Sequence, residues 1–239
     1  MLFTTSWDDG HVLDHKLIDL LKKYGMKGTF YISKEHELVH ERLSEREIHD
    51  LAHEMECGAH TLTHPDLTSV TPDNARKEIA DSKVWMESIT QKTCDLFCYP
   101  RGRFNDVIKS MTKECGFRGA RTTELYRFTL QDPFAMPVSL HIYPFPFRPI
   151  ANRRFYEPFS MARAKLGSAI PLSRYTSWLS FAKALFDHAY QTNQPFFHLF
   201  GHSWEIEKFR MWDHLEKFLS YVASKKDLQH VPNSSLLRS

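Results

Sequence analysis

The chain has 239 residues, with 31 basic and 29 acidic side chains and a formal net charge of +2 at pH 7. This balance argues against a protein that binds nucleic acid by neutralising phosphates, because such proteins carry a clear basic excess. Hydrophobic residues at 42% and charged residues at 25% are typical of a globular domain and exclude disorder. The 14 histidines are unusual, and metal ligands, proton-transfer groups or scattered surface imidazoles would account for them.

The first residues lack the basic and apolar regions of a signal peptide, and no run reaches the roughly 18 apolar residues that a membrane helix needs. We therefore expect a cytoplasmic protein without a membrane span. The 4 cysteines match neither a zinc-ribbon nor a CxxC pattern, so reduced and mostly buried thiols are expected.

Apolar runs of strand length alternate with amphipathic helical patterns over the first half of the chain. In chain order, the predicted elements are a strand at 2–7, a helix at 12–24, a strand at 27–32, a helix opening at a capping box at 44–47, a strand at 57–61, a helix at 72–89, a strand at 94–99, a helix at 105–115 and a strand at 118–122. Five such alternations with short loops indicate a parallel sheet.

Residues 140–175 break this pattern, because prolines and aromatic residues are interspersed throughout. So long an irregular segment predicts a lid or the wall of a binding groove, with a packed surface excursion as the alternative. A helix at 177–191, a strand at 195–200 and a helix at 209–223 are predicted after it. No repeat or linker is visible, so residues 1–239 are expected to form a single domain.

Polar or unusual residues follow the strands, and parallel α/β folds gather their chemistry at the carboxyl ends of strands. The pattern therefore predicts an α/β fold resembling a barrel, with the candidate site at its mouth. An open, doubly wound sheet is the alternative. No glycine-rich nucleotide-binding motif follows the first strand to support it.

Two adjacent carboxylates, Asp8 and Asp9, follow the first strand and precede Gly10. Because neighbouring carboxylates repel, a metal ion that binds one and leaves the other as a base would stabilise the pair. A simple turn also favours aspartate and glycine, so the tripeptide alone is weak support for a site.

Histidines complete three candidate groups. His60 and His64, four residues apart, would share a divalent ion if they lay on a helical turn. With one carboxylate they form a set of three ligands that leaves positions open for water and substrate. His202 follows the apolar run 196–200 and is a reasonable proton donor, with a capping or buried structural histidine as the alternative.

In this order, these groups resemble the motifs of the polysaccharide deacetylase family, the NodB-homology carbohydrate esterases of the family 4 type. The resemblance extends from residue 2 to about residue 205. Residues 6–10, SWDDG, correspond to the motif TFDDG, and residues 60–64, HTLTH, match H-[ST]-x-x-H in full. Residues 99–102, YPRG, correspond to the third motif, and His202 corresponds to the last.

The resemblance implies a distorted (β/α) barrel with fewer than eight repeats and a metal-dependent hydrolase. It implies that Asp9, His60 and His64 bind the metal, with Asp8 as the general base and His202 as the general acid. The backbone N–H of the third motif, here that of Arg101, would stabilise the oxyanion together with the metal. Zn²⁺ is the expected ion, although Co²⁺, Ni²⁺ and Fe²⁺ also suit two histidines and an aspartate.

The chain departs from the family pattern in residues that surround the predicted metal ligands and base. The arginine that many members place in the third motif to orient the base is replaced by Cys98, and the motif's tyrosine by Arg101. We expect Arg121, at the end of the fifth predicted strand, to steady Asp8 instead. A fourth motif of the D-x-x-D-W type is not evident.

The resemblance predicts hydrolysis of an acetyl group from an N-acetylated, or less favourably an O-acetylated, sugar or glycan. Tyr99, Pro100 and Trp204 are predicted to contact this substrate, with Trp204 as a stacking face or alternatively a core residue. Hydrolysis of another C–N bond, as in a formamide or cyclic amide, is the alternative reaction. A carbohydrate-binding protein with a decayed site is the non-enzymatic alternative.

Only three histidines are thus assigned to chemistry. The others include a polar stretch with His36, His40, His49 and His53, and these are predicted to serve solvation alone.

Overall fold

The computed structural model describes residues 1–149, 152 and 154–238. The strands are β1 (Leu2–Asp8), β2 (Gly28–Ile32), β3 (Glu56–Ala59), β4 (Leu96–Cys98), β5 (Gly119–Arg121), β6 (Leu140–His141), β7 (Phe196–Gly201) and β8 (Gln229–His230). The helices are α1 (Asp14–Lys23), α2 (Glu45–Glu54), α3 (Pro72–Thr90), α4 (Asp106–Glu114), α5 (Glu157–Leu166), α6 (Trp178–Gln191), α7 (Ser203–Lys208) and α8 (Trp212–Ala223).

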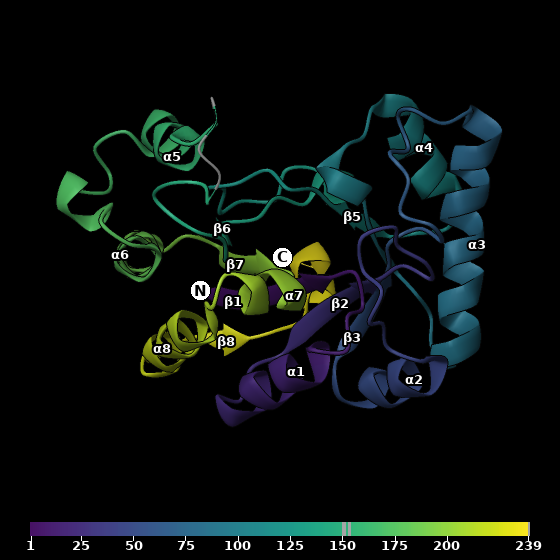
Figure 1. The fold of residues 1–239 in the computed structure, drawn as a ribbon, viewed down its shortest axis with the longest axis horizontal. Coiled ribbons are helices and arrows are strands. Elements are labelled where there is room, and N and C mark those ends of the chain that lie inside the picture. The colour runs from purple at the N-terminus through teal and green to yellow at the C-terminus, as the bar shows by residue number, and fades with distance from the viewer. Residues whose placement is uncertain (150–151, 153, 239) are drawn as a thin grey trace.

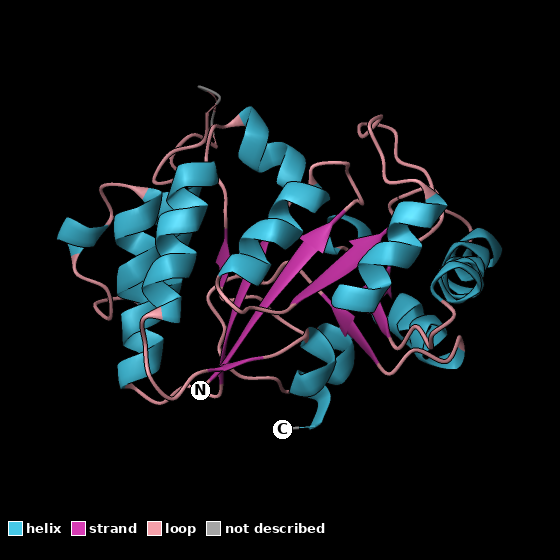
Figure 2. Cartoon of the chain, turned by 90° about the horizontal axis from the view of Figure 1, so that it is seen from below, coloured by secondary structure: helices cyan, strands magenta, loops and turns pink. Residues whose placement is uncertain are grey.

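The strands form one sheet in the order β5-β4-β3-β2-β1-β7-β6, with β8 paired to the start of β1. Every named pairing is parallel. This is the cyclic order of a barrel that stays open between β5 and β6, and helices surround the strands (Figures 1 and 2). The fold is therefore a distorted (β/α) barrel with fewer than eight repeats, as predicted, and not a doubly wound sheet.

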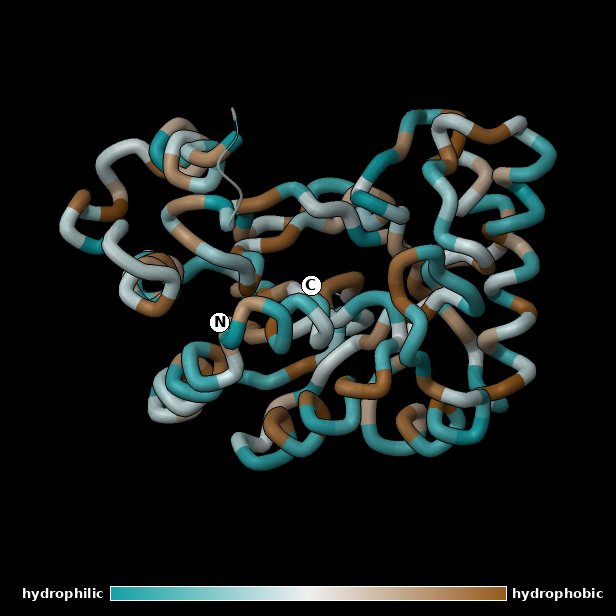
Figure 3. Tube along the Cα trace, in the orientation of Figure 1, coloured by the Kyte–Doolittle hydropathy of each residue, from teal (hydrophilic) through white to brown (hydrophobic). Residues whose placement is uncertain are grey.

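Burial explains why the central strands form. Six of the seven residues of β1 are buried, as are all five of β2, so both faces of these strands pack against neighbours. Hydrophobic and hydrophilic positions are interspersed along the surrounding helices (Figure 3), and in α1 the hydrophobic residues Leu17, Ile18 and Leu21 are buried. The predicted capping box of α2 is present, since the Ser44 side chain accepts from the Glu47 N–H and the Glu47 side chain accepts from the Ser44 N–H.

The second half of the chain differs most from the sequence prediction. The predicted helix 209–223 begins only at Trp212, and the short helix α7 precedes it. Strands β6 and β8 span two residues each and were not predicted, because two residues show no periodicity. Helix α5 lies inside the proline-rich segment, where Pro158 occupies its first turn and causes no break.

Two further observations concern the whole described chain. Within the described residues, no helix is both long enough and apolar enough to cross a bilayer. All 4 cysteines are free thiols, as the sequence predicted, but only Cys94 and Cys98 are buried, whereas Cys57 and Cys115 are partly exposed.

Asp14, the first residue of α1, is fully buried and accepts a hydrogen bond of 2.5 Å from the Ser203 hydroxyl. Burial raises the pKa of Asp14 to about 8. In the unfolded chain an aspartate titrates near about 4, so between these pH values the folded state holds a proton that the unfolded state has lost. The contribution of Asp14 to stability is therefore present at low pH and lost as the pH rises towards 8.

We expect Asp14→Asn to be more stable than the wild type at pH 8, by about 1–3 kcal/mol, or roughly 2–4 °C of melting temperature for each kcal/mol. The gain should shrink towards pH 5, because keeping the wild-type carboxyl protonated costs less free energy as the pH approaches the unfolded value near about 4. Thermal melts of the chelator-treated protein at pH 5, 6.5 and 8 measure this. Asp19→Asn, on the exposed face of α1, is the control. A difference that does not change with pH would contradict the prediction.

Candidate active site

The carboxyl ends of the parallel strands meet at one edge of the sheet, and the predicted residues lie there. Asp8 ends β1, His60 follows β3, Arg121 ends β5 and His202 follows β7. His141, which the sequence did not single out, ends β6 at the same edge. The fold thus brings together residues from five strands that are far apart along the chain.

At this edge, several residues other than glycine adopt the left-handed backbone conformation, which a Cβ atom makes unfavourable. Asp9, Thr61, His64 and Arg101 all have positive φ, at 80°, 65°, 57° and 59°. A positive φ is uncommon in residues other than glycine, and residues that adopt it cluster at functional sites. Gly10 also has positive φ, and a Cβ there would lie 2.6 Å from the Ile32 side chain, so only glycine fits directly after the carboxylates.

Three imidazoles surround one oxygen of Asp9. The Nε2 atoms of His36, His60 and His64 lie 3.6, 3.7 and 3.8 Å from Asp9 Oδ1. Ligands on a tetrahedral zinc with bonds near 2.1 Å are separated by about 3.4 Å, so a small adjustment would accommodate an ion between them. Asp9, His60 and His64 were predicted, but His36 was assigned to solvation. That assignment is wrong, because the His36 side chain is only 4% exposed.

His60 and His64 meet through a bend and not through the predicted helical turn. Thr61 and His64 both have positive φ, which excludes a regular helix, and the two rings lie 4.7 Å apart. Glu78 of α3 stabilises the bend, because its carboxylate accepts hydrogen bonds from the N–H groups of Leu62 and Thr63 at 2.8 and 2.9 Å. Glu78 is thus a supporting residue that the motif alone does not reveal.

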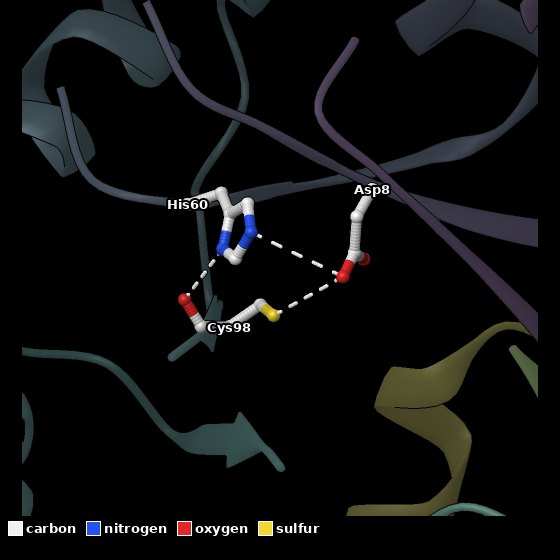
Figure 4. A group of neighbouring side chains, drawn as sticks. All are labelled: Asp8, His60 and Cys98. Atoms are coloured by element: carbon white, nitrogen blue, oxygen red, sulfur yellow. Dashed lines mark hydrogen bonds and ion pairs between the residues drawn. The ribbon is translucent and has the colours of Figure 1, made fainter. Parts of the chain in front are cut away.

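His60 is oriented with its Nε2 towards the carboxylates. Its Nδ1 lies 2.8 Å from the backbone oxygen of Cys98, which can only accept, so Nδ1 carries the proton (Figure 4). The lone pair on Nε2 therefore faces Asp8 and Asp9, at 4.0 and 3.7 Å. This is the usual arrangement of a histidine that binds a metal.

The predicted contact between Arg121 and Asp8 is present. The Arg121 Nη2 donates to Asp8 Oδ2, and both side chains are buried. The same nitrogen lies 2.8 Å from Cys98 Sγ, and the Cys98 thiol donates towards Asp8 Oδ2 at 3.7 Å (Figure 4). Arg121 thus reaches the carboxylate from β5, in a chain that has cysteine where the family motif has arginine.

His202 lies on the other side of the carboxylates. Its Nε2 is 3.9 Å from both Asp8 Oδ2 and Asp9 Oδ2, while its Nδ1 is 2.7 Å from Glu205 Oε2. Burial by itself lowers the pKa of His202, but the negative charges of Glu205, Asp9 and Asp8 together raise it to about 10. His202 is therefore protonated near neutral pH, as a general acid requires. Glu205 was not predicted, although its position three residues after His202 on a helix is a readable signal.

His60 and His64 have the opposite protonation. Burial is the largest influence on both and lowers the pKa of each, that of His64 to about 2. Burial would raise the pKa of Asp9, but neighbouring imidazoles, His202 foremost, lower it. Two neutral imidazoles and a carboxylate are the donors that a divalent transition metal prefers. In addition, the buried Nδ1 of His64 has no hydrogen-bond partner within the described chain, so no hydrogen bond to the protein fixes this nitrogen of the ring. The residues present therefore fit a divalent cation.

The predicted substrate contacts are only partly at the rim. The side chains of Tyr99 and Pro100 are buried, and the Tyr99 hydroxyl donates to the backbone oxygen of Phe134 at 3.0 Å. Their side chains are therefore not exposed at the rim. Trp204 donates its indole N–H to Asp9 Oδ2 at 2.9 Å and so orients the carboxylate. Arg101 is exposed and pairs with Glu37 at 2.9 Å.

A cavity of about 500 Å³ adjoins His141 and Glu205. Much of its wall comes from the proline-rich segment predicted as a lid or groove wall, including Tyr143, Phe145 and Arg148. Residues 150, 151 and 153 of that segment lie outside the described residues. The cavity is open and is lined by both aromatic and charged side chains, which suits a ring-shaped polar ligand.

Comparison with known proteins gives one family. Residues 3–120 match the model of the polysaccharide deacetylase family. The chain is 30% identical over 125 residues to YxkH of Bacillus subtilis (strain 168), a match that covers 50% of this chain and 43% of that protein. It is 29% identical over 119 residues to the peptidoglycan-N-acetylmuramic acid deacetylase PdaA of the same organism, covering 49% and 43%. The matched region thus spans less than half the length of these curated relatives.

The similarity in three dimensions extends further along the chain. A family 4 acetyl xylan esterase from Clostridium thermocellum, solved with a cobalt ion, superposes with a TM-score of 0.61 at 15% identity. This match covers 100% of the present chain and 91% of the esterase. At so low an identity it shows a common fold and no more.

Proposed function

The chain belongs to the polysaccharide deacetylase family, whose members are NodB-homology carbohydrate esterases, and on this premise we propose that it removes acetyl groups from an N-acetylated sugar or glycan by metal-dependent hydrolysis. The observation that carries the proposal is the different environment of two adjacent carboxylates. Asp9 lies near the neutral imidazoles of His60 and His64, whereas Asp8 contacts the buried guanidinium of Arg121. One carboxylate is thus suited to bind a cation and the other to accept a proton.

Asp9, His60 and His64 would hold the metal, with Zn²⁺ the expected ion. Bound there, it would polarise the acyl group and lower the pKa of a water molecule towards about 7. The chain's own residues provide the remaining steps. Asp8, which pairs with the buried Arg121 guanidinium, would accept the proton of the attacking water.

His202 would give its proton to the leaving nitrogen, because an amine anion is a poor leaving group. Glu205 holds the imidazole from the side opposite the carboxylates and keeps it charged until that step. The backbone N–H of Arg101, in a strained left-handed conformation, would face the developing negative charge on the acyl oxygen.

The cavity beside Glu205 supports a sugar as the substrate. Its mixture of aromatic and charged lining residues suits the apolar face and the hydroxyl groups of a sugar ring. Amides need a protonated leaving group more than esters do, and His202 is held protonated, so N-acetyl substrates are favoured over O-acetyl ones.

The metal site is tested first by elemental analysis. We expect one equivalent of zinc in the wild type, and an affinity at least about 100-fold lower in Asp9→Ala and His64→Ala, because each loses a ligand. Competition with a chromophoric chelator measures the affinity. His53→Ala, at an exposed position of α2, is the matched control and should bind zinc like the wild type. Equal zinc binding by all four proteins would refute this ligand set.

The reaction is tested by acetate release. Zinc-loaded protein is incubated with N-acetylglucosamine oligomers, with peptidoglycan and with acetylated xylan, and a chelator should abolish release from any substrate that is cleaved. If none of the three releases acetate, the deacetylase proposal fails. Release of formate from formamides instead would favour the alternative reaction.

A further inference from the structure

His36 stands among the metal-site residues without belonging to the motifs of the family. It lies in the segment between β2 and α2, which backbone hydrogen bonds from Glu35 to Leu62 and from Leu43 to Gly10 hold over the carboxylates. Its ring lies 4.1 Å from that of His64. By distance alone it would be a fourth protein ligand.

The hydrogen bonds of the ring indicate another role. The backbone N–H of Leu38 donates to His36 Nδ1 at 3.0 Å. A backbone N–H can only donate, so Nδ1 must be the acceptor and the proton of the neutral imidazole lies on Nε2. That nitrogen then has no lone pair for a metal.

The hydrogen bond of His60 has the opposite direction, so the two histidines differ in which ring nitrogen carries the proton. Its Nδ1 donates to the Cys98 oxygen, which leaves the lone pair on Nε2 for a metal. Both Nε2 atoms lie at nearly the same distance from Asp9 Oδ1, at 3.6 Å for His36 and 3.7 Å for His60. One of them presents a proton to the site and the other presents a lone pair.

A separation of 3.6 Å is too long for a hydrogen bond from His36 to Asp9, so the Nε2 proton is available to an acceptor that enters the site. We propose that His36 is a further catalytic residue, which donates its Nε2–H to the acyl oxygen of the substrate and does not bind the metal. This inference rests on the proposed deacetylation. A neutral donor in a buried position stabilises developing negative charge there.

The protonation of His36 is tested directly by NMR of protein labelled with ¹⁵N-histidine, with His36→Ala used for assignment. In the zinc-loaded protein, we expect His36 to carry its proton on Nε2 and His60 to carry it on Nδ1. Zinc affinity should change less than about threefold in His36→Ala, compared with at least about 100-fold in His64→Ala. An Nδ1-protonated His36 in the zinc form, or a loss of zinc affinity like that of His64→Ala, would overturn the proposal.

The contact with the acyl oxygen is tested with acetate, whose carboxylate presents the same kind of oxygen. Calorimetric titration of the zinc-loaded proteins should show acetate binding at least about tenfold weaker in His36→Ala. His36→Gln, which places an N–H near the same position, should recover part of the loss, and the exposed His40→Ala should match the wild type. Unchanged acetate affinity in His36→Ala would refute the role.

Kinetics separate this inference from the proposed function. With a cleaved substrate, we expect kcat of His36→Ala to fall about 10²- to 10³-fold, as for loss of one oxyanion donor. If the wild type cleaves nothing, the deacetylase proposal fails, while the NMR and acetate results still decide the role of His36.

Discussion

Arg121→Met is expected to lower the free energy of unfolding by about 3–5 kcal/mol, the range for removing one partner of a buried ion pair. The Arg121 side chain is 0% exposed and that of Asp8 is 4% exposed, so the substitution leaves the Asp8 carboxylate in the core without its cation. Urea denaturation of the chelator-treated protein at pH 8 measures this loss.

Two controls distinguish the buried charge from lost packing. Arg118→Met removes an arginine whose side chain is 59% exposed and which pairs with Asp95, so a change within about 0.5 kcal/mol is expected. The double variant Asp8→Asn with Arg121→Met removes both charges and should regain much of the stability. If Arg121→Met costs no more than Arg118→Met, the ion pair does not stabilise the fold as inferred.

His202→Ala should lower kcat by about 10²- to 10⁴-fold with zinc affinity unchanged, because it removes the proton donor and leaves Asp9, His60 and His64 intact. Since the pKa of His202 is raised to about 10, the wild-type rate should stay high at neutral pH and fall only on the alkaline side. Acetate release measured from pH 6 to 11 gives both the rate and the position of that fall.

Glu205→Gln keeps the imidazole but removes the nearest negative charge, which lies 2.7 Å from His202 Nδ1. It should therefore move the alkaline fall to lower pH, with a smaller loss of rate at pH 6 than at pH 9. A loss of less than tenfold in His202→Ala with zinc retained would argue against its role as the acid. If the fall of rate at high pH stays at the same pH in Glu205→Gln, Glu205 does not raise the pKa of His202.

The local pattern of the sequence predicted much of the first half of the fold. Apolar runs and capping residues act over a few positions, so β1 and β2 were predicted close to their observed bounds and α2 at its observed start. In the second half, β6 and β8 are only two residues long, and pairing with a neighbouring strand defines them. No pattern within so short a segment can indicate that pairing.

By itself, the sequence predicted the family, the parallel barrel and the residues proposed here to bind a metal and transfer protons, since each motif is a short string at the end of a strand. The tertiary structure decided what surrounds them. Arg121 contacts Asp8 across 113 positions because β5 and β1 end at the same edge, and His36 faces Asp9 because its loop folds back over that edge. Such contacts depend on the order of strands in the sheet and on where a loop packs, and local sequence patterns determine neither of these.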